Sequence, residues 1–331
     1  MKTLHFILTV FALVACALFV GCSKTDNTPP TGVAGVTPEG QMEMRFRWIV
    51  GKQYVVRMDL HQTSEVEIPN AKQPMQQETT MGQDYTISVL KELPDGGREL
   101  QLEFTGMNLS SKAGDRVVLS FDSAQDPSGD ARNPAASIFR KMIGGRLKYV
   151  TDADGRVVSV EGARELSDRV LAGSDPQLKA SFSSMYSEGY LKQLCDTARM
   201  APSRGVKPGD SWMMNFNEEM GTIGTLDANV KMKFKDWEQH GDRKCARIES
   251  KGEITSTPTG GANGPAAALS IQIEEGTMTG SSWFDPELGM VVDSDSDQNL
   301  TLKITTRGQI LTSRAKQKVI YKLVDVADVI E

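Results

Sequence analysis

The chain has little histidine, little cysteine and no excess of positive charge. Its 331 residues include three His and four Cys, and 37 Lys+Arg stand against 43 Asp+Glu, a net charge of −6. Without surplus cations to neutralise phosphates, a nucleic-acid binder is not expected. Four Cys in this length exclude a domain built on disulfides. Aromatic residues make up 6%, which argues against a sugar-binding cleft lined by stacking rings.

Motifs that carry catalysis are also missing. His61 and His240 lie outside any His-Glu-x-x-His pattern and are expected at the surface. The sequence has no Gly-x-Ser-x-Gly elbow, and its Gly-rich runs lack the Lys-Ser/Thr of a phosphate loop. We therefore predict a protein that is not an enzyme and has no cofactor, with an enzyme of unknown class as the third alternative.

The N-terminus reads as an export signal. Residues 1–21 have one Lys, then an apolar run, and Val20-Gly21 stands directly before Cys22. This resembles the lipobox of bacterial lipoproteins, in which the Cys is acylated, for example with palmitate, and the chain is cut before it. Cys16, in Leu13-Val14-Ala15-Cys16, is the competing site, and an uncleaved anchor helix is the other alternative. We predict acylation at Cys22.

The residues after the predicted cut suggest a location. Ser23, rather than Asp, follows Cys22. By resemblance to Gram-negative lipoproteins, this implies the outer membrane, with the chain facing the periplasm. Residues 22–41 are rich in Thr, Asn, Pro and Gly, which predicts a flexible tether between the lipid and the domain.

Beyond residue 45 the dominant hydrophobic period is two, which is typical of antiparallel strands with one solvated face. Four turn sequences, at 94–97, 152–155, 240–242 and 286–289, separate the expected strands. Helices are expected at 133–144, 162–171 and 175–200, where the apolar spacing becomes helical. The apolar positions that alternate are Tyr54, Val56, Met58 and Leu60; Leu100, Leu102 and Phe104; Val230, Met232 and Phe234; Leu269, Ile271 and Ile273; and Leu300, Leu302 and Ile304.

Two stretches of the chain are alike. Gly51-Lys-Gln-Tyr54 and Gly209-Asp-Ser-Trp212 each open a strand, and each half later reaches a turn followed by Val-Val. We predict one β-rich domain at 42–331, with a first β half at 45–160, a helical middle at 161–200 and a second β half at 205–327. Chance recurrence of hairpins is the alternative.

A lipobox, Gly-x-x-Tyr, a later Gly-Asp-x-Trp and closing Val-Val hairpins resemble an uncharacterised family of bacterial envelope lipoproteins. More distantly, residues 45–325 are similar to the lipoprotein-carrier half-barrel. That resemblance implies an α+β fold of mainly β structure: a curved antiparallel sheet, or incomplete barrel, with helices covering its concave face. It implies no catalytic residues.

Three sets of residues are candidates for a site. An apolar-ligand lining is predicted on the strands of the second half, with a packed core as the alternative; its members are Trp212, Met214, Phe216, Val230, Met232 and Phe234. Asp293, Asp295 and Asp297 should share one solvated strand face, with a weak cation site as the alternative, and no metal is predicted. Cys195 and Cys245 could pair as a disulfide in an oxidising compartment. Two free thiols are the alternative, because Cys245 alternates with Ala246 and Ile248 and so falls on the polar face of its strand.

These features favour an outer-membrane lipoprotein that binds an apolar ligand or lipid. The alternative is a structural or protein-binding module of the envelope without a ligand cavity. The expected partners are the membrane, through the acyl chains, and a lipid or another envelope protein.

Overall fold

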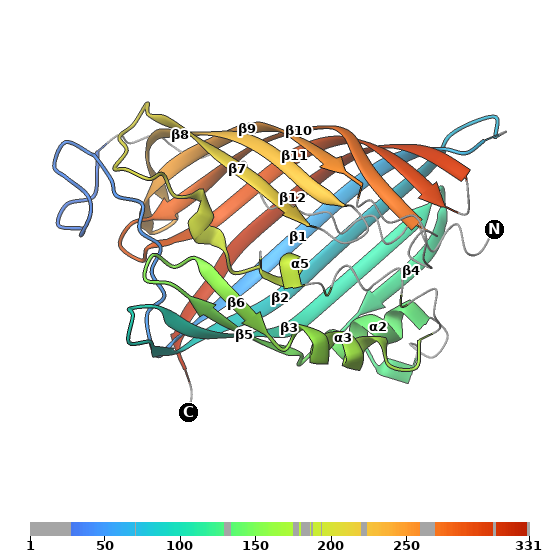
Figure 1. Cartoon of the computed structure of the whole chain (residues 1–331), viewed down its shortest axis with the longest axis horizontal. Coiled ribbons are helices and arrows are strands. Elements are labelled where there is room, and N and C mark those ends of the chain that lie inside the picture. The colour runs from blue at the N-terminus through green and yellow to red at the C-terminus, as the bar shows by residue number, and fades with distance from the viewer. Residues whose placement is uncertain are drawn as a thin grey trace.

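The computed structural model describes residues 28–69, 71–128, 134–174, 179, 186, 188–192, 194–219, 224–258, 269–306 and 309–329. In these residues one antiparallel sheet of twelve strands dominates the structure. Figure 1 shows the sheet curled into an open trough, with β7 at one edge and β4 and β6 at the other. The predicted curved, incomplete barrel is therefore confirmed.

The sheet consists of two meanders joined by their first and last strands. The strand order is β6-β5-β3-β2-β1-β12-β11-β10-β9-β8-β7, with β4 pairing β3. The first meander contains β1 (Lys52–Glu67), β2 (Met75–Glu92), β3 (Arg98–Ala113), β4 (Arg116–Asp122), β5 (Arg146–Thr151) and β6 (Val157–Glu161). The second contains β7 (Ser211–Glu219), β8 (Thr225–His240), β9 (Arg243–Thr257), β10 (Leu269–Asp285), β11 (Met290–Thr306) and β12 (Gln309–Asp328).

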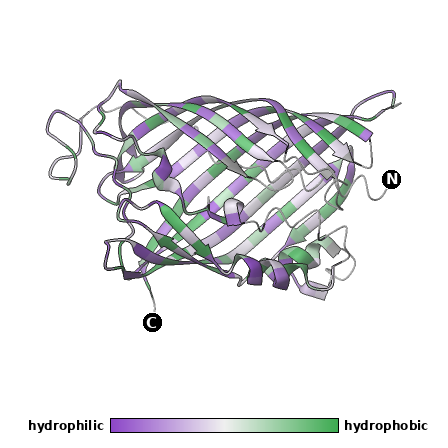
Figure 2. Cartoon of the chain, in the orientation of Figure 1, coloured by the Kyte–Doolittle hydropathy of each residue, from purple (hydrophilic) through white to green (hydrophobic). Residues whose placement is uncertain are grey.

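Alternation of side chains gives the sheet two different faces. Along β1, Tyr54, Val56, Met58 and Leu60 are buried and their neighbours are more exposed, as the period of two predicts. We call the side that carries these four residues the concave face and the opposite side the convex face. Figure 2 shows the same alternation of hydropathy along the strands. The four predicted turns all join neighbouring strands.

The helices are short: one lies within the first meander, between β4 and β5, and the others follow β6. They are α2 (Pro134–Met142), α3 (Ala163–Leu171), α5 (Glu188–Lys192) and the 3-10 helix η4 (Thr197–Met200). The first two match the predicted helices at 133–144 and 162–171. The helix expected over 175–200 is wrong at its C-terminal part, because a turn at 194–196 separates α5 from η4. The start of that expected helix lies outside the described residues.

The second part of the predicted tether is docked onto the domain. Val36 forms a β-bridge with Met42, and Met42 forms another with Val206. Phe46 packs on Phe284 with ring centroids 5.3 Å apart, and the Arg47 amide donates to the carbonyl of Gly289. A flexible tether was the wrong prediction for 33–41, because backbone pairing and the turn at Gly40 hold this segment in place. The strap, residues 33–50, crosses the strand ends near the C-terminus (Figure 1).

Gly289 is required where the strap meets the β10–β11 turn. Its φ is +71°, and an added Cβ would lie 2.7 Å from Nε of Arg47. A side chain there would be strained in the backbone and would also displace the Arg47 side chain, which donates to the carbonyls of Pro286 and Glu287.

Candidate functional site: the concave face and its helical cover

All six residues predicted to line an apolar site lie on the concave face of β7 and β8. The register places Trp212 opposite Met232 and Met214 opposite Val230, so the two strands present one continuous surface. Five of the six are buried in the main hydrophobic cluster, and Trp212 packs at its margin. The structure thus brings the predicted residues together. It packs them as a core, which was the alternative prediction.

Methionine recurs on this face well beyond the predicted six. A long, unbranched, polarisable side chain fills irregular apolar space and can repack around a new occupant. Beyond the predicted Met214 and Met232, the buried Met residues of β1, β2, β3 and β10 are Met58, Met81, Met107 and Met278, and the helices α2 and η4 contribute Met142 and Met200. The concave face is therefore adaptable as well as apolar.

One row of the concave face is polar across five neighbouring strands. Each member is at most 4% exposed, and the row consists of Gln298 on β11, Gln317 on β12, Gln62 on β1, Thr79 on β2 and Ser111 on β3. The Gln317 amide donates to Gln298 Oε1 at 2.6 Å, and the hydroxyls of Thr79 and Ser111 lie 3.0 Å apart. Our sequence analysis missed this row. Counting by two onward from Leu60 would have placed Gln62 on the buried face.

Helices α2 and α3 cover the concave face at the first meander's edge. Phe139 of α2 packs on Phe121 of β4 with centroids 5.8 Å apart. Leu166 of α3 sits where a Cβ on Gly145 would approach it to 2.6 Å, so the glycine allows this close contact. Amphipathic spacing, with Leu166 and Val170 on one face, puts the apolar side of α3 inward.

The segment 188–200 bridges the two open edges of the sheet. The Tyr149 hydroxyl donates to the Leu191 carbonyl at 2.7 Å, and the Asp196 carboxylate accepts from the Val157 amide at 3.2 Å. On the other side, Trp212 Nε1 donates to the Met200 carbonyl at 2.9 Å. Figure 1 shows α5 lying between β6 and β7. We call residues 188–200 the cover. Hydrogen bonds between side chains and backbone groups hold it, and no strand ladder does so in the described residues.

Cys195 of the cover lies deep against the concave face. Burial raises the pKa of its thiol, and Asp196 raises it further, while the nearby Tyr149 hydroxyl opposes the shift. Burial likewise raises the pKa of Tyr85 and Tyr321, with Cys195 adding to both. These groups are therefore neutral at physiological pH, and the centre of the site carries no charge from them.

In the part of the chain that the structure describes, the cavity beneath the cover is small. A cavity of about 20 Å³ lies where the cover meets β3, lined by Gln83, Phe104, Met107, Met142, Tyr186, Tyr190, Leu191 and Leu194. That volume holds about one water molecule. An apolar ligand could enter here only if the cover moved.

The two cysteines predicted as a possible disulfide are both free. Cys195 belongs to the main cluster, whereas Cys245 belongs to a separate small cluster with Trp283 and Val292. Cys245 lies on the convex face, as its alternation with Ala246 predicted. The sheet separates the two thiols, so the structure shows the alternative of two free thiols and not the possible disulfide.

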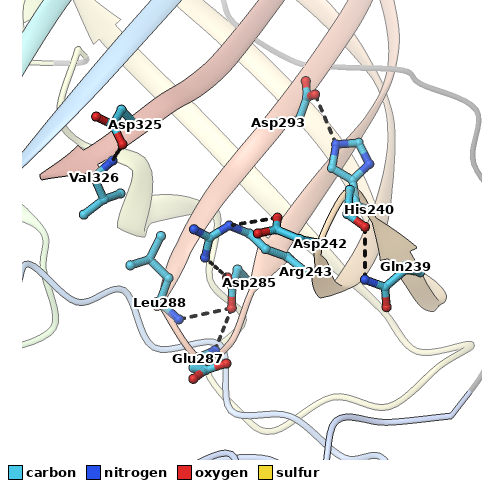
Figure 3. Close-up of polar contacts among 11 residues, drawn as sticks. Gln239, His240, Asp242, Arg243, Asp285, Glu287, Leu288, Asp293, Asp325 and Val326 are labelled. Atoms are coloured by element: carbon cyan, nitrogen blue, oxygen red, sulfur yellow. Dashed lines mark hydrogen bonds and ion pairs between the residues drawn. The ribbon is translucent and has the colours of Figure 1, made fainter.

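His240 is not the surface group that we predicted. Its ring stacks on Trp283 with centroids 4.5 Å apart. Figure 3 shows its other contact, in which Nε2 lies 3.1 Å from Asp293. Close by, Arg243 donates to Asp285 at 2.8 Å, and Asp285 also accepts from the Glu287 and Leu288 amides. These bonds tie the β8–β9 hairpin to the β10–β11 turn. His61 is exposed on β1, as expected.

The three aspartates of β11 share the convex face, as predicted, but they are not uniformly solvated. Asp293 pairs with His240, and Asp295 is 8% exposed and lies 3.3 Å from the Lys318 amine. In the described part of the chain, no group of three His, Cys, Asp or Glu could hold a metal ion. Cys22 and Cys16 lie outside the described residues. No helix among those described is both long and apolar enough to cross a membrane.

Comparisons with known proteins bear on the family and the fold. The model of a family of unknown function, DUF6263, matches residues 95–291. No curated protein matches the chain. A solved structure of lipovitellin, described by its lipid–protein interactions, has a TM-score of 0.46 and 9% identity over 86% of this chain, which spans 26% of the lipovitellin chain.

Two bacterial structures are also similar in outline. One is a protein described as exported, with a YmcC-like fold, from Bacteroides fragilis (TM-score 0.23, 12% identity, 83% of this chain and 96% of that one). The other is described as a lipoprotein of Parabacteroides distasonis (TM-score 0.25, 13% identity, 83% of this chain and 95% of that one). At these scores the likenesses say nothing about ligand or activity.

Proposed function

The chain belongs to the DUF6263 family of unknown function, and we propose that it is a lipid-anchored, non-catalytic envelope protein that holds an apolar ligand between its concave face and its cover. The observation that carries this proposal is the pairing of a methionine-rich apolar wall with a cover that no strand ladder holds among the described residues. The ligand class that fits is a lipid acyl chain.

Opening the cover should be easier than opening the sheet. The three hydrogen bonds named above join the cover to β5, β6 and β7, and each such bond contributes roughly 1 kcal/mol net. Leu191, Ala198 and Met200 add buried apolar contact. Elements of this kind open locally at a free energy well below that of global unfolding.

Burial of an acyl chain would offset the contacts that are lost when the cover leaves the concave face. Each buried CH₂ contributes about 0.8 kcal/mol, so ten methylenes would offset the loss of several contacts. The cavity beneath the cover has a volume of about 20 Å³, which is too small for an acyl chain. An acyl chain would therefore bind by displacing the cover from the concave face.

The anchoring half of the proposal rests on Val20-Gly21-Cys22 and the polar residues that follow. We propose that Cys22 is acylated and that the domain faces the periplasm from the outer membrane. Labelled palmitate should enter the wild-type chain and the Cys16→Ala variant but not Cys22→Ala. Labelling that survives in Cys22→Ala and vanishes in Cys16→Ala would move the anchor to Cys16.

The binding half is tested with protein purified from its own envelope. Organic extraction and mass spectrometry should find lipid in stoichiometric amount. Met232→Trp fills space on the concave face and should reduce the bound lipid several-fold. Met213→Trp is the matched control, because Met213 lies on the convex face of the adjacent strand and is 56% exposed.

Two results would contradict ligand binding: no stoichiometric lipid in wild type, or equal lipid in both tryptophan variants. A stable fold with no lipid would favour the second candidate function, a structural or protein-binding module. The packed state of the six predicted lining residues is the observation that supports this alternative.

A further inference from the structure

Several positively charged side chains line a hollow on the convex face of the sheet. It has a volume of about 410 Å³ and lies over β8, β9 and β10. We call it the lysine hollow. Its side chains are Lys231, Lys233, Arg247, Lys251, Thr279 and Ser281, together with Glu249.

Strand register forces the cations together. Lys231 stands directly opposite Lys251, and Lys233, two residues along the same face of β8, stands opposite Glu249. Like charges directly opposite each other across neighbouring strands destabilise a sheet. The chain as a whole has a net charge of −6, so this cluster of positive charge has the opposite sign to the chain's net charge.

The lysines of the hollow have no ion-pair partners among the described residues. Elsewhere on the sheet, Lys148 pairs with Glu99, Lys112 with Glu78, and Lys318 with Asp295. In the hollow, Glu249 lies 3.4 Å from Lys235 and 3.7 Å from Arg247. Its charge is thus already shared by two cations outside the lysine trio. On the far side of the hollow, Asp297 of β11 stands opposite Thr279.

The guanidinium of Arg247, which also lines the hollow, is a fourth positive charge that is incompletely paired. It lies 3.7 Å from Glu238 and from Glu249, and within the described structure it makes no hydrogen bond to either. Its Nε is buried without a partner. A guanidinium offers five donors in a fixed plane. Here the two terminal nitrogens lie within ion-pair distance of Glu238 and Glu249, and Nε has no partner. Arg247 lines the hollow together with Thr279 and Ser281.

We propose that the lysine hollow is an anion site that binds a phosphate group, either free or carried by a lipid headgroup. A phosphate presents several acceptor oxygens to the lysine ammonium groups, the guanidinium and the two hydroxyls at once. The site is on the opposite side of the sheet from the proposed apolar site. It does not depend on acyl-chain binding, and its test can fail while that proposal stands.

The test measures lysine acetylation rates by mass spectrometry on the full chain, kept in neutral detergent for the phosphate measurement and reconstituted without detergent for the nanodisc measurement. Inorganic phosphate, at ionic strength held constant with chloride, should protect Lys231 and Lys251 at least tenfold more than Lys316 and Lys322, which are exposed on the same face. Nanodiscs of phosphatidylcholine, with and without phosphatidylglycerol, test the second source. Protection by phosphate assigns a free-phosphate site, and protection by anionic nanodiscs alone assigns a headgroup site.

Matched variants separate a site from general surface charge. By calorimetry with the protecting probe, Lys231→Gln/Lys251→Gln should weaken binding at least tenfold, Lys316→Gln/Lys322→Gln should leave it unchanged, and Lys231→Arg should retain it. Circular dichroism checks that each variant is folded. Equal weakening in both double variants, or no protection by either probe, would overturn the proposal.

Discussion

The concave and convex faces of the second meander each bury a tryptophan completely, and the surroundings of the two rings differ. Trp237 lies in the main cluster, edge-on to Phe234 at 5.1 Å between centroids. Trp283 lies in a cluster with Cys245 and Val292 and stacks on the His240 ring. The concave ring is thus buried by a continuous core, and the convex ring by a few neighbours at the hairpin ends. Although the two rings are equally buried, removing them need not lower the free energy of unfolding by the same amount.

Truncating the two tryptophans should give the largest effects. We expect Trp237→Ala to lower the free energy of unfolding by about 3–5 kcal/mol, the usual cost of a large core truncation. Trp283→Ala should cost less, because its polar neighbours can admit water to the space. Urea denaturation of both variants measures the difference. A larger loss for Trp283→Ala would mean that the convex cluster is a second core.

The polar row of the concave face should show the next largest effect. Gln317→Leu removes the amide that donates to Gln298 and should cost about 1–3 kcal/mol, the penalty for losing one partner of a buried bond. Gln298→Leu/Gln317→Leu should recover part of that loss. Denaturation of the single and double variants gives the coupling. Additive losses would mean that the two amides act independently.

A smaller, pH-dependent effect is expected at Asp236 on the convex face. Burial raises the pKa of this carboxyl and a like-charged Glu249 adds to the rise, while Arg247 and Lys235 oppose it. A raised folded-state pKa means that stability is fully present below the unfolded value of about 3.9 and falls as pH rises through the folded value. Asp236→Asn should therefore stabilise the fold at pH 7 and have little effect near pH 3. A variant that is less stable at pH 7 would show that the attraction of Arg247 exceeds the cost of burial.

The two thiols should differ in reactivity. Burial raises the pKa of both, so alkylation by iodoacetamide requires local opening. If the cover opens before the sheet, Cys195 should be modified in the native state sooner than Cys245. Peptide mapping without reductant follows both sites, and alkylation after denaturation confirms that both are free. Faster modification of Cys245 would place the weakest part of the fold at the β8–β9 hairpin.

Much of the fold could be predicted because a period of two is local. The buried positions of β1 and the turn at Gly289 follow from a few consecutive residues. The burial of Trp283 could not be predicted this way, since an outward position is covered only by side chains from other hairpins. The strap was missed for the same reason: Met42 and Phe46 are buried by Val206 and Phe284, which are far away in the sequence.

The apolar residues on the concave face could be predicted from the sequence, but the structure of the cover could not. Met232 and Phe234 alternate with lysines, and this alternation alone assigns them to the apolar face. On either side of the break between α5 and η4, the backbone of the cover accepts hydrogen bonds from Tyr149 and Trp212. Nothing in the helical spacing of that stretch indicates where those bonds fall.

The pairing of β1 with β12 has a consequence for how the chain folds. Lys52 stands opposite Asp328, so the two meanders join only when nearly the whole chain is present. Closing so long a loop is slow, because its entropy must be lost before the contacts that reward it can form. Until then each meander exposes an unpaired inner edge, which is a hazard for aggregation. A ribosome-bound chain could assemble the first meander but could not complete the sheet, so the last strand determines when the protein becomes a single folded body.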